Sequence, residues 1–183
     1  MTASPLRLAG YVELPAHQGN GGFDHAAVHA ASGHVYVAHT ANGAIDVFDP
    51  ASRRHLFSVP DLPGVAGALV SDEAQLIFSS NRAANTIGIF APGPNPTVRK
   101  VDVGVRPNGL AYDHRRRIVL AANVGDPAVP GSHTLSMIDL AKGGQRTDIA
   151  VRGRTRWAVY DAQRETFFVN IASPRPAAPY WRR

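Results

Sequence analysis

The sequence contains no cysteine among its 183 residues. It therefore forms neither a disulfide framework nor a thiolate metal site. No apolar run approaches the length of about 18 residues that a membrane-spanning helix needs. The first residues, MTASPLRLAGYVELPAHQG, lack the basic stretch and following apolar stretch of a signal peptide. These absences predict a cytoplasmic protein with no membrane partner.

Several catalytic and nucleotide-binding motifs are also missing. No G-x-S-x-G nucleophile elbow occurs in the chain. Neither G-x-G-x-x-G nor a Walker loop is present, so nucleotide binding has no support. Long helices are not expected, because 17 glycines and 14 prolines interrupt the sequence too often.

The chain is basic, with a net charge of +5 and a pI near 10.1. Its main basic runs lie at 115–117, at 152–156 and in the tail after 174. Aromatic residues do not interleave with these runs, as a stacking platform for nucleic acid requires. The run at 115–117 falls where a hairpin turn is expected, which indicates a solvated turn. We therefore expect no nucleic-acid partner.

What the sequence does contain is an internal repeat. The strings VYVAH, IFSSN and VLAAN end at His39, Asn81 and Asn123, each 42 residues after the last. Gly67 and Gly109 are also 42 apart, and Trp157 follows Gly109 by 48. The larger spacing places one six-residue insertion in GDPAVPGSH. A period in the low forties with several short strands per unit is typical of a β-propeller blade.

Each period divides into four short strands. The strings HVYVAH and RIVLAAN are apolar on both faces, as expected for a sheet covered by a neighbour on each side. The fourth period supplies only WAVYD and TFFVNIA before the proline-rich tail SPRPAAPYWRR. Proline is excluded from central strands, so no further strand is expected in that tail.

These patterns predict an all-β fold, a partial β-propeller of about three and a half four-stranded antiparallel blades. An N-terminal segment at 1–22 contains one further candidate outer strand, LAGYVEL at 8–14. The expected units then follow in order: blade 1 at 23–64, blade 2 at 65–106, blade 3 at 107–155, half of blade 4 at 156–173, and an aberrant Pro/Arg tail at 174–183.

The strings GGFDHAAVHAASGHVYVAH, GVRPNGLAYD and GRTRWAVYD resemble the YncE-like, YVTN-repeat β-propeller proteins of bacteria. These are distant relatives of lactonase and gluconolactonase-type propellers. The resemblance covers about residues 10–173 and implies chains of roughly seven blades. This sequence supplies about half of them, so we expect a truncated propeller.

Propeller geometry predicts which residues share one end of the ring. The first strand of a blade begins where the second ends, because the two are antiparallel neighbours. Polar residues gather there, and the six-residue insertion adds Asp126 and His133. Loops held by a rigid scaffold commonly bind ligands. The predicted ligand-binding residues are Asp24, His25, His39, Asn81, Arg82, Asn108, Asn123, Arg156 and Trp157.

Structural roles compete with this hypothesis. Asparagine at a strand end often caps a turn, which is the alternative for Asn81, Asn85 and Asn123. For Trp157 the alternative role is packing in the core. Tyr112 and Tyr160 are expected to pack between blades.

The residues themselves indicate no cofactor. The resemblance, however, implies a possible divalent cation, since gluconolactonase-type relatives hold one in the channel with carboxylate and asparagine oxygens. Asp24 and Asn108 match positions from which such oxygens point inward, which suits a hard cation. Other ligands would come from blades that this sequence does not contain.

Three functions remain open. The first is binding of a small polar ligand or metabolite at one rim, with lactonase-like activity in longer relatives. The second is a protein-interaction scaffold, and the third is a non-functional fragment of a seven-bladed propeller. A rim of Asp, His, Asn and Arg favours the polar ligand, because protein interfaces are richer in aromatic residues. The uncovered last hairpin also predicts self-association through its exposed edge.

Overall fold

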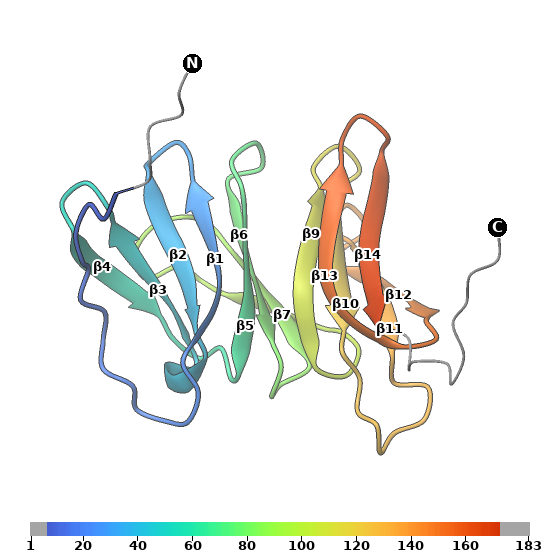
Figure 1. Cartoon of the computed structure of the whole chain (residues 1–183). Helices are drawn as coiled ribbons and strands as arrows, with labels where there is room; N and C mark the ends of the chain where they lie inside the picture. The colour runs from blue at the N-terminus through green and yellow to red at the C-terminus, as the bar shows by residue number, and fades with distance from the viewer. Residues whose placement is uncertain (1–6, 173–183) are drawn as a thin grey trace.

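The computed structural model describes residues 7–172 of the chain. In these residues, fourteen strands form three antiparallel sheets of four strands and one of two. The sheets fan out with their faces toward one another (Figure 1). The predicted partial β-propeller of three and a half blades is confirmed.

Within each blade the strands pair in sequence order, and each pair is antiparallel. Blade 1 contains β1 (Phe23–His29), β2 (His34–His39), β3 (Ala44–Asp49) and β4 (Arg54–Val59). Blade 2 contains β5 (Val65–Ser71), β6 (Leu76–Asn81), β7 (Thr86–Phe90) and β8 (Arg99–Asp102). Blade 3 contains β9 (Pro107–Asp113), β10 (Ile118–Asn123), β11 (Thr134–Asp139) and β12 (Gln145–Ala150). The last hairpin contains β13 (Arg154–Asp161) and β14 (Thr166–Ala172).

The last hairpin begins slightly earlier than expected. Its first strand starts at Arg154, whereas the repeat placed the boundary at 156. The predicted end of this unit at 173 and the tail at 174–183 lie outside the described residues.

The candidate outer strand at 8–14 is wrong, because this segment has no strand pairing in the structure. Its residues pass the outer side of blade 1, where Gly10 lies against the Arg53 side chain, without backbone pairing to an edge strand. The chain instead runs along the side of blade 1 (Figure 1). It is fixed further on by Asn42, whose Oδ1 accepts from the Gln18 N–H at 2.8 Å and whose Nδ2 donates to the Ala16 carbonyl at 3.0 Å.

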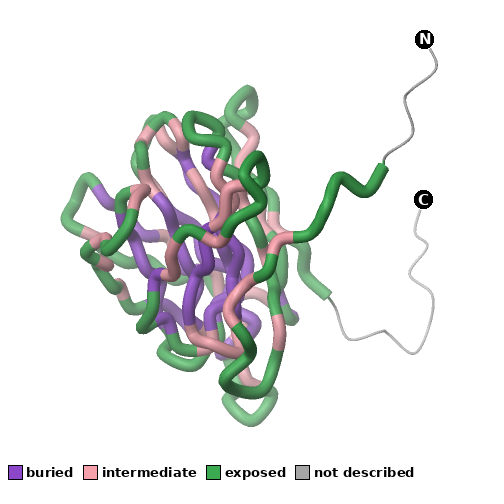
Figure 2. The backbone as a smooth tube through the Cα atoms, turned by 90° about the vertical axis from the view of Figure 1, so that its left-hand side faces the viewer, coloured by how far each residue is buried: buried purple, intermediate pink, exposed green. Residues whose placement is uncertain are grey.

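Two hydrophobic cores hold the blades together, one in each gap between complete blades. Adjacent residues of β6 point to opposite sides: Ile77 packs toward blade 1 and Phe78 toward blade 3. Strand β7 is buried along its whole length because blade 2 has a neighbour on both faces. Figure 2 shows this buried interior, with exposed residues at the turns. A continuous apolar run in the sequence therefore marks a strand between two blades.

Tyr112 and Tyr160 occupy matching positions in blades 3 and 4. Tyr112 packs in the second core, with its ring centroid 4.8 Å from that of Phe78 in the neighbouring blade. The ring centroid of Tyr160 lies 4.9 Å from that of Phe167 in its own hairpin, and burial and the Asp113 carboxylate of blade 3 raise the pKa of its hydroxyl. The expected inter-blade packing is thus observed for Tyr112.

The helical content of the described residues is limited to one short 3₁₀ turn, η1 (Thr40–Asn42). No helix in residues 7–172 has the length and apolarity that crossing a bilayer requires.

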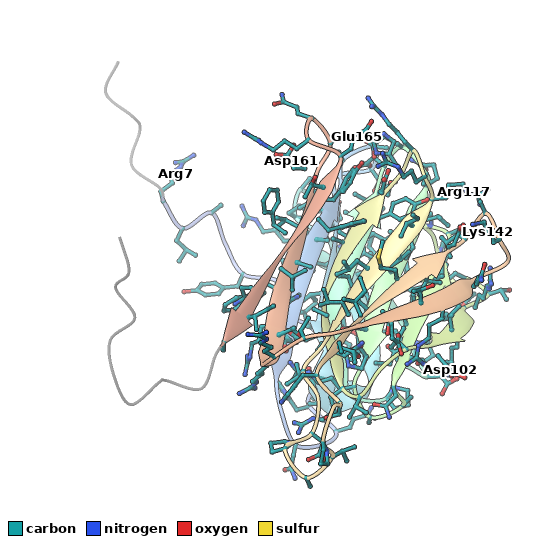
Figure 3. All side chains as sticks on the ribbon, turned by 90° about the vertical axis from the view of Figure 1, so that its right-hand side faces the viewer. Arg7, Asp102, Arg117, Lys142, Asp161 and Glu165 are labelled. Carbon is teal, nitrogen blue, oxygen red and sulfur yellow. The ribbon has the colours of Figure 1, made fainter. Side chains whose placement is uncertain are left out.

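The two ends of the blades have different contents. One end carries the starts of the inner strands β1, β5, β9 and β13 together with the loops that follow β2, β6 and β10; we call it the start rim. It lies at the bottom of Figure 1. The opposite end, the turn rim, carries the tight turns and the residues Arg117, Lys142, Asp161 and Glu165 (Figure 3).

Candidate functional site

A bulge recurs at the start of all four inner strands. In each blade, regular pairing with the second strand is interrupted one or two residues after the inner strand begins. Bulges bend a strand and change the direction of its side chains, and they are common beside functional sites. The residues in the four bulges are Asp24 and His25, Ala66, Asn108 and Gly109, and Arg156 and Trp157.

Two glycines allow the inner strands to approach each other at these bulges. A Cβ atom at Gly67 would lie 2.5 Å from the Asn108 carbonyl oxygen of the next blade. A Cβ atom at Gly109 would collide with the Arg156 carbonyl oxygen in the same way. The start rim is therefore a close-packed arc in which consecutive inner strands touch.

Arg82 connects three blades at this rim. Its guanidinium lies 3.5 Å from the Asp24 carboxylate of blade 1. The Asn108 amide, oriented so that both of its ends are satisfied, accepts from the same guanidinium and donates to the Arg156 carbonyl at 3.0 Å. Asp24 also lies 3.6 Å from the His25 ring. The structure thus brings the predicted residues Asp24, His25, Arg82 and Asn108 together.

Burial, one carboxylate and three other arginines act on the charge of Arg82. Burial lowers the pKa of Arg82, the Asp24 carboxylate opposes that effect, and the positive charges of Arg156, Arg106 and Arg154 lower the pKa further. The buried Nε of Arg82 has no hydrogen-bond partner within residues 7–172. Four guanidinium groups therefore share one part of the rim with a single carboxylate partner.

A cavity of about 200 Å³ opens beside these arginines. Arg106 and Arg154 line it from the starts of blades 3 and 4, and the loop that contains the insertion supplies the remaining wall. We call this cavity the arginine pocket. Its lining residues are Arg106, Val124, Gly125, Pro127, His133 and Arg154.

The insertion loop is held in place by its own hydrogen bonds. The Val124 N–H donates to the Arg106 carbonyl at 3.0 Å, which ties the loop to the pocket. The Ser132 hydroxyl both accepts from the Asp126 N–H and donates to the Asp126 carbonyl. His133 Nδ1 lies 2.6 Å from the Val124 carbonyl and therefore carries the proton of that hydrogen bond. These hydrogen bonds hold the loop in the position where it lines the pocket.

The structure corrects the assignment of His39, Asn81 and Asn123 as ligand-binding residues. All three side chains are fully buried. His39 Nδ1 bonds Asp46 at 2.7 Å, whereas the two asparagines donate to Thr86 and Thr134 of the neighbouring strands. They fix the second strand to the third within each blade, so a ligand in solvent cannot reach them. For Asn81 and Asn123, the alternative of turn capping was nearer to the observed role, because each donates to a threonine across the loop.

The other two predicted residues, Arg156 and Trp157, are exposed. The Arg156 carbonyl accepts from Asn108, and its guanidinium belongs to the cluster around Arg82. Trp157 is 57% exposed and borders a shallow apolar hollow on the hairpin face with Val159 and Phe168. It does not join the arginine pocket.

The possible cation ligands do not assemble into a centre. No group of three His, Asp or Glu side chains suited to a metal ion occurs in the part of the chain that the structure describes. Asp24 faces the Arg82 guanidinium, and Asn108 contacts the same group. This environment suits an anion better than a cation, because its charge is mainly positive.

The basic run at 115–117 lies on the turn rim, far along the strands from the arginine pocket (Figure 3). Arg116 lies 2.9 Å from Asp113 and also pairs with Glu165 of the last hairpin, and Arg115 lies 3.3 Å from Glu165. The three arginines are exposed in a turn, as expected, and the contacts to Glu165 also join blade 3 to blade 4.

Comparison with known proteins supports the fold. No protein-family model matches the sequence, and no curated protein resembles it in sequence. Among solved structures, it is similar to hydrazine synthase of Kuenenia stuttgartiensis with a TM-score of 0.71 and 10% identity. The alignment covers 91% of this chain and 46% of that one.

Two further similar structures have other functions. A catalytically inactive virginiamycin B lyase of Staphylococcus aureus, solved with quinupristin, gives a TM-score of 0.66 at 10% identity, over 86% of this chain and 52% of that one. The Cps50 (Swd1) β-propeller domain of Myceliophteria thermophila gives 0.60 at 12% identity, over 82% and 54%. The chain is a β-propeller protein. It spans about half the length of these neighbours.

Sequence reasoning did not single out Arg106, which lines the arginine pocket, and treated Arg154 only as part of a charge run. The repeat contains the missing signal, since Arg154 follows Arg106 by 48 residues, the spacing that also separates Trp157 from Gly109. The two arginines therefore occupy the same position in consecutive blades. The insertion between them was located correctly, but its role as a pocket wall depends on the folded loop.

Proposed function

We propose that this chain is a YncE-like β-propeller protein that binds a small polar ligand at the start rim. The observation that carries this proposal is the bulge repeated at the start of every inner strand. It gathers Asp24, His25, Asn108 and the Arg156 backbone from three blades around Arg82. Convergent polar groups on a rigid scaffold are typical of small-ligand sites.

The structural neighbours are compatible with this function. Two of them are a streptogramin B lyase and a virginiamycin B lyase, the latter solved with quinupristin, so the fold can hold a small molecule. Likeness at this level of identity supports the scaffold and leaves the reaction open. Lactonase-like activity belongs to this proposal only for longer relatives, whose further blades complete the ring.

A second candidate function is protein interaction. The observation that favours it is the exposed apolar face of the β13–β14 hairpin, where Trp157, Val159 and Phe168 are each at least half exposed. Exposed apolar patches of this kind mark interaction surfaces. The start rim is the stronger candidate because its polar groups are positioned by contacts between blades.

The test is a thermal-shift screen of uncharged polar compounds, including sugars, polyols and lactones, against the full chain. Compounds that raise the unfolding temperature are then titrated against His25→Ala and Arg156→Ala. Matched controls are His114→Ala and Arg54→Ala, which lie in or beside tight turns at the opposite rim. We expect binding to weaken about tenfold or more in the rim variants only. Absence of binding by both these compounds and the anions tested below, or equal weakening by the controls, would contradict the proposal.

A further inference from the structure

We propose that the arginine pocket binds the carboxylate or phosphate group of a small anionic molecule. This inference rests on the proposed function, because the pocket belongs to the start rim, and it specifies the class of ligand. Arg106 and Arg154 are the two residues assigned to the anion, and His133 borders the same cavity.

The positive charge of the pocket is not neutralised by the protein. Within residues 7–172, no Asp or Glu carboxylate lies within 4 Å of the guanidinium groups of Arg106, Arg154 or Arg156. The residues outside this range, MTASPL and SPRPAAPYWRR, contain neither Asp nor Glu. The cluster therefore lacks the acidic side chains that usually accompany grouped arginines.

Two acidic side chains of the start rim, Asp24 and Asp126, already have partners of their own. Asp24 lies against Arg82 and His25. The Asp126 carboxylate accepts from the Ala128 N–H at 2.9 Å, within its own loop. Arg106 and Arg154 are exposed, and like charges that line one cavity repel one another. A bound anion removes this repulsion and supplies the missing partner.

The chemistry of the lining fits a carboxylate or a phosphate. Each guanidinium presents parallel N–H donors that match two oxygens of such a group. His133 uses Nδ1 on the Val124 carbonyl, so Nε2 is the ring nitrogen that remains for a ligand. The cavity of about 200 Å³ accommodates a small molecule or one charged group of a larger molecule.

The placement of the pocket also follows from the repeat. Arg106 and Arg154 stand at the same repeat position. Arg106 directly precedes β9 and Arg154 begins β13, and these two strands are neighbours. Blade 2 has Gly64 at the corresponding position, 42 residues before Arg106. The insertion lies in blade 3, where its loop packs over this arginine pair. The paired arginines and the longer loop thus occur together at one gap between blades.

The experiment is a titration of the full chain with inorganic phosphate and, separately, with succinate, followed by the arginine Nε–H signals in nuclear magnetic resonance. Arg106→Gln and Arg154→Gln assign the two signals and test their contribution. Arg54→Gln is the matched control, since it removes the same charge from an exposed residue at the other end of the molecule. Unfolding midpoints of all variants verify that the fold is retained.

We expect at least one of the two anions to bind saturably at low ionic strength, more weakly as salt is added. Each pocket variant should weaken that binding about tenfold or more, whereas Arg54→Gln should leave it unchanged. Binding of phosphate alone would indicate that the charged group of the ligand is a phosphate. Binding of succinate alone would indicate that it is a carboxylate.

Two results would overturn the inference. One is the absence of saturable binding of either anion, and the other is an equal loss of affinity in Arg54→Gln. If uncharged compounds still bind the start rim in that case, the proposed function stands and only the ligand class is wrong. If no compound of either kind binds, both proposals fail.

Discussion

At the scale of single residues, carboxylates close the tight turns of the blades. The Asp113 carboxylate accepts from the backbone N–H groups of Arg115 and Arg116 at 3.0 and 3.1 Å. The same residue one repeat later, Asp161, accepts from Gln163 and Arg164 at 2.9 and 3.0 Å. The turn rim is therefore stabilised by repeated, ionised caps.

The first prediction concerns stability in acid. Burial acts to raise the pKa of Asp113, but hydrogen bonds from the Arg116 backbone and side chain outweigh it, so the pKa lies below 3.8. Hydrogen bonding to Arg164 likewise lowers the pKa of Asp161. Both groups then bind fewer protons in the folded state than in the unfolded one. Their contribution is complete above about pH 3.9 and is lost as the pH falls through the folded pKa values.

Urea unfolding between neutral and strongly acidic pH measures this loss. Asp113→Asn keeps an oxygen that caps the turn but cannot titrate, so its free energy of unfolding should depend less steeply on pH below 3.8. Identical pH profiles for the variant and the wild-type chain would contradict the assignment.

The second prediction concerns the buried pair of blade 1. Asp46 accepts from His39 Nδ1 at 2.7 Å and from the Ser58 hydroxyl at 2.6 Å. Asp46→Ala leaves the buried His39 Nδ1 without its partner and removes one of the two contacts of the half-buried Ser58 hydroxyl, which should lower the free energy of unfolding by about 3–5 kcal/mol. His55→Ala, which removes a half-buried contact to Ser58 at 3.0 Å, should cost only about 1 kcal/mol. Denaturant titration compares the two variants, and equal losses would count against a special role for Asp46.

Predictability at this scale was uneven. The sequence placed His39, Asn81 and Asn123 at strand ends on the correct rim. It did not reveal that they face inward, because the bonded partners Asp46, Thr86 and Thr134 lie across a loop. The period of the repeat fixes the position of a residue along a blade. It does not determine which side chains meet across the sheet.

At the scale of elements, the repeat predicted the strands well. The three complete blades begin at Phe23, Val65 and Pro107, where the 42-residue spacing placed them. The segment at 8–14 failed because strand composition alone does not provide a partner strand. The bulges were also not predicted, since the residues that form them differ from blade to blade.

The third prediction tests the contact between inner strands. In Gly109→Ala, the added Cβ would collide with the Arg156 carbonyl and approach Trp157 Cα to 2.8 Å. Overpacking against backbone atoms should lower the free energy of unfolding by about 1–3 kcal/mol. Amide exchange should increase mainly in β13 and β14. The matched control is Gly22→Ala, whose nearest neighbour lies 3.9 Å away, and unchanged exchange in the hairpin of Gly109→Ala would refute the contact.

At the scale of the whole molecule, the blades cover one another except at the two ends of the array. Phe78 and Ile87 are completely buried between complete blades, whereas Val159 and Phe168 of the last hairpin are 59% and 50% exposed. Repeat arrays bury each unit on the next, so the terminal face has the weakest cover. The sequence anticipated this asymmetry because the fourth period stops after two strands.

The fourth prediction is self-association through that face. The 183-residue chain should form dimers or larger species, because burying this apolar surface is favourable. Val159→Lys places a charge in the centre of the exposed face and should shift the population toward monomer. Light scattering coupled to size-exclusion chromatography, over a range of concentrations, measures the change. The control is Val28→Lys, at a residue of similar exposure in blade 1. It shows whether self-association depends on the face of the last hairpin in particular.

A monomeric wild-type chain that melts cooperatively would contradict this prediction and would indicate a self-sufficient half-ring. The fold class was predictable at this scale because the repeat sets it. The ligand was not, because its chemistry depends on arginines from different blades and on one folded loop.

The recurring bulge gives every blade a side-chain position on the start rim that varies while the strand pairing stays the same. This position holds a different residue in each inner strand, namely Asp24, Ala66, Asn108 and Arg156. The following position is less variable, because Gly67 and Gly109 leave no room for a Cβ atom beside the next blade. All four inner strands keep their antiparallel pairing with the second strand although these residues differ. Ligand recognition at the start rim can therefore change one blade at a time, by evolution or by design, while the strand framework is retained.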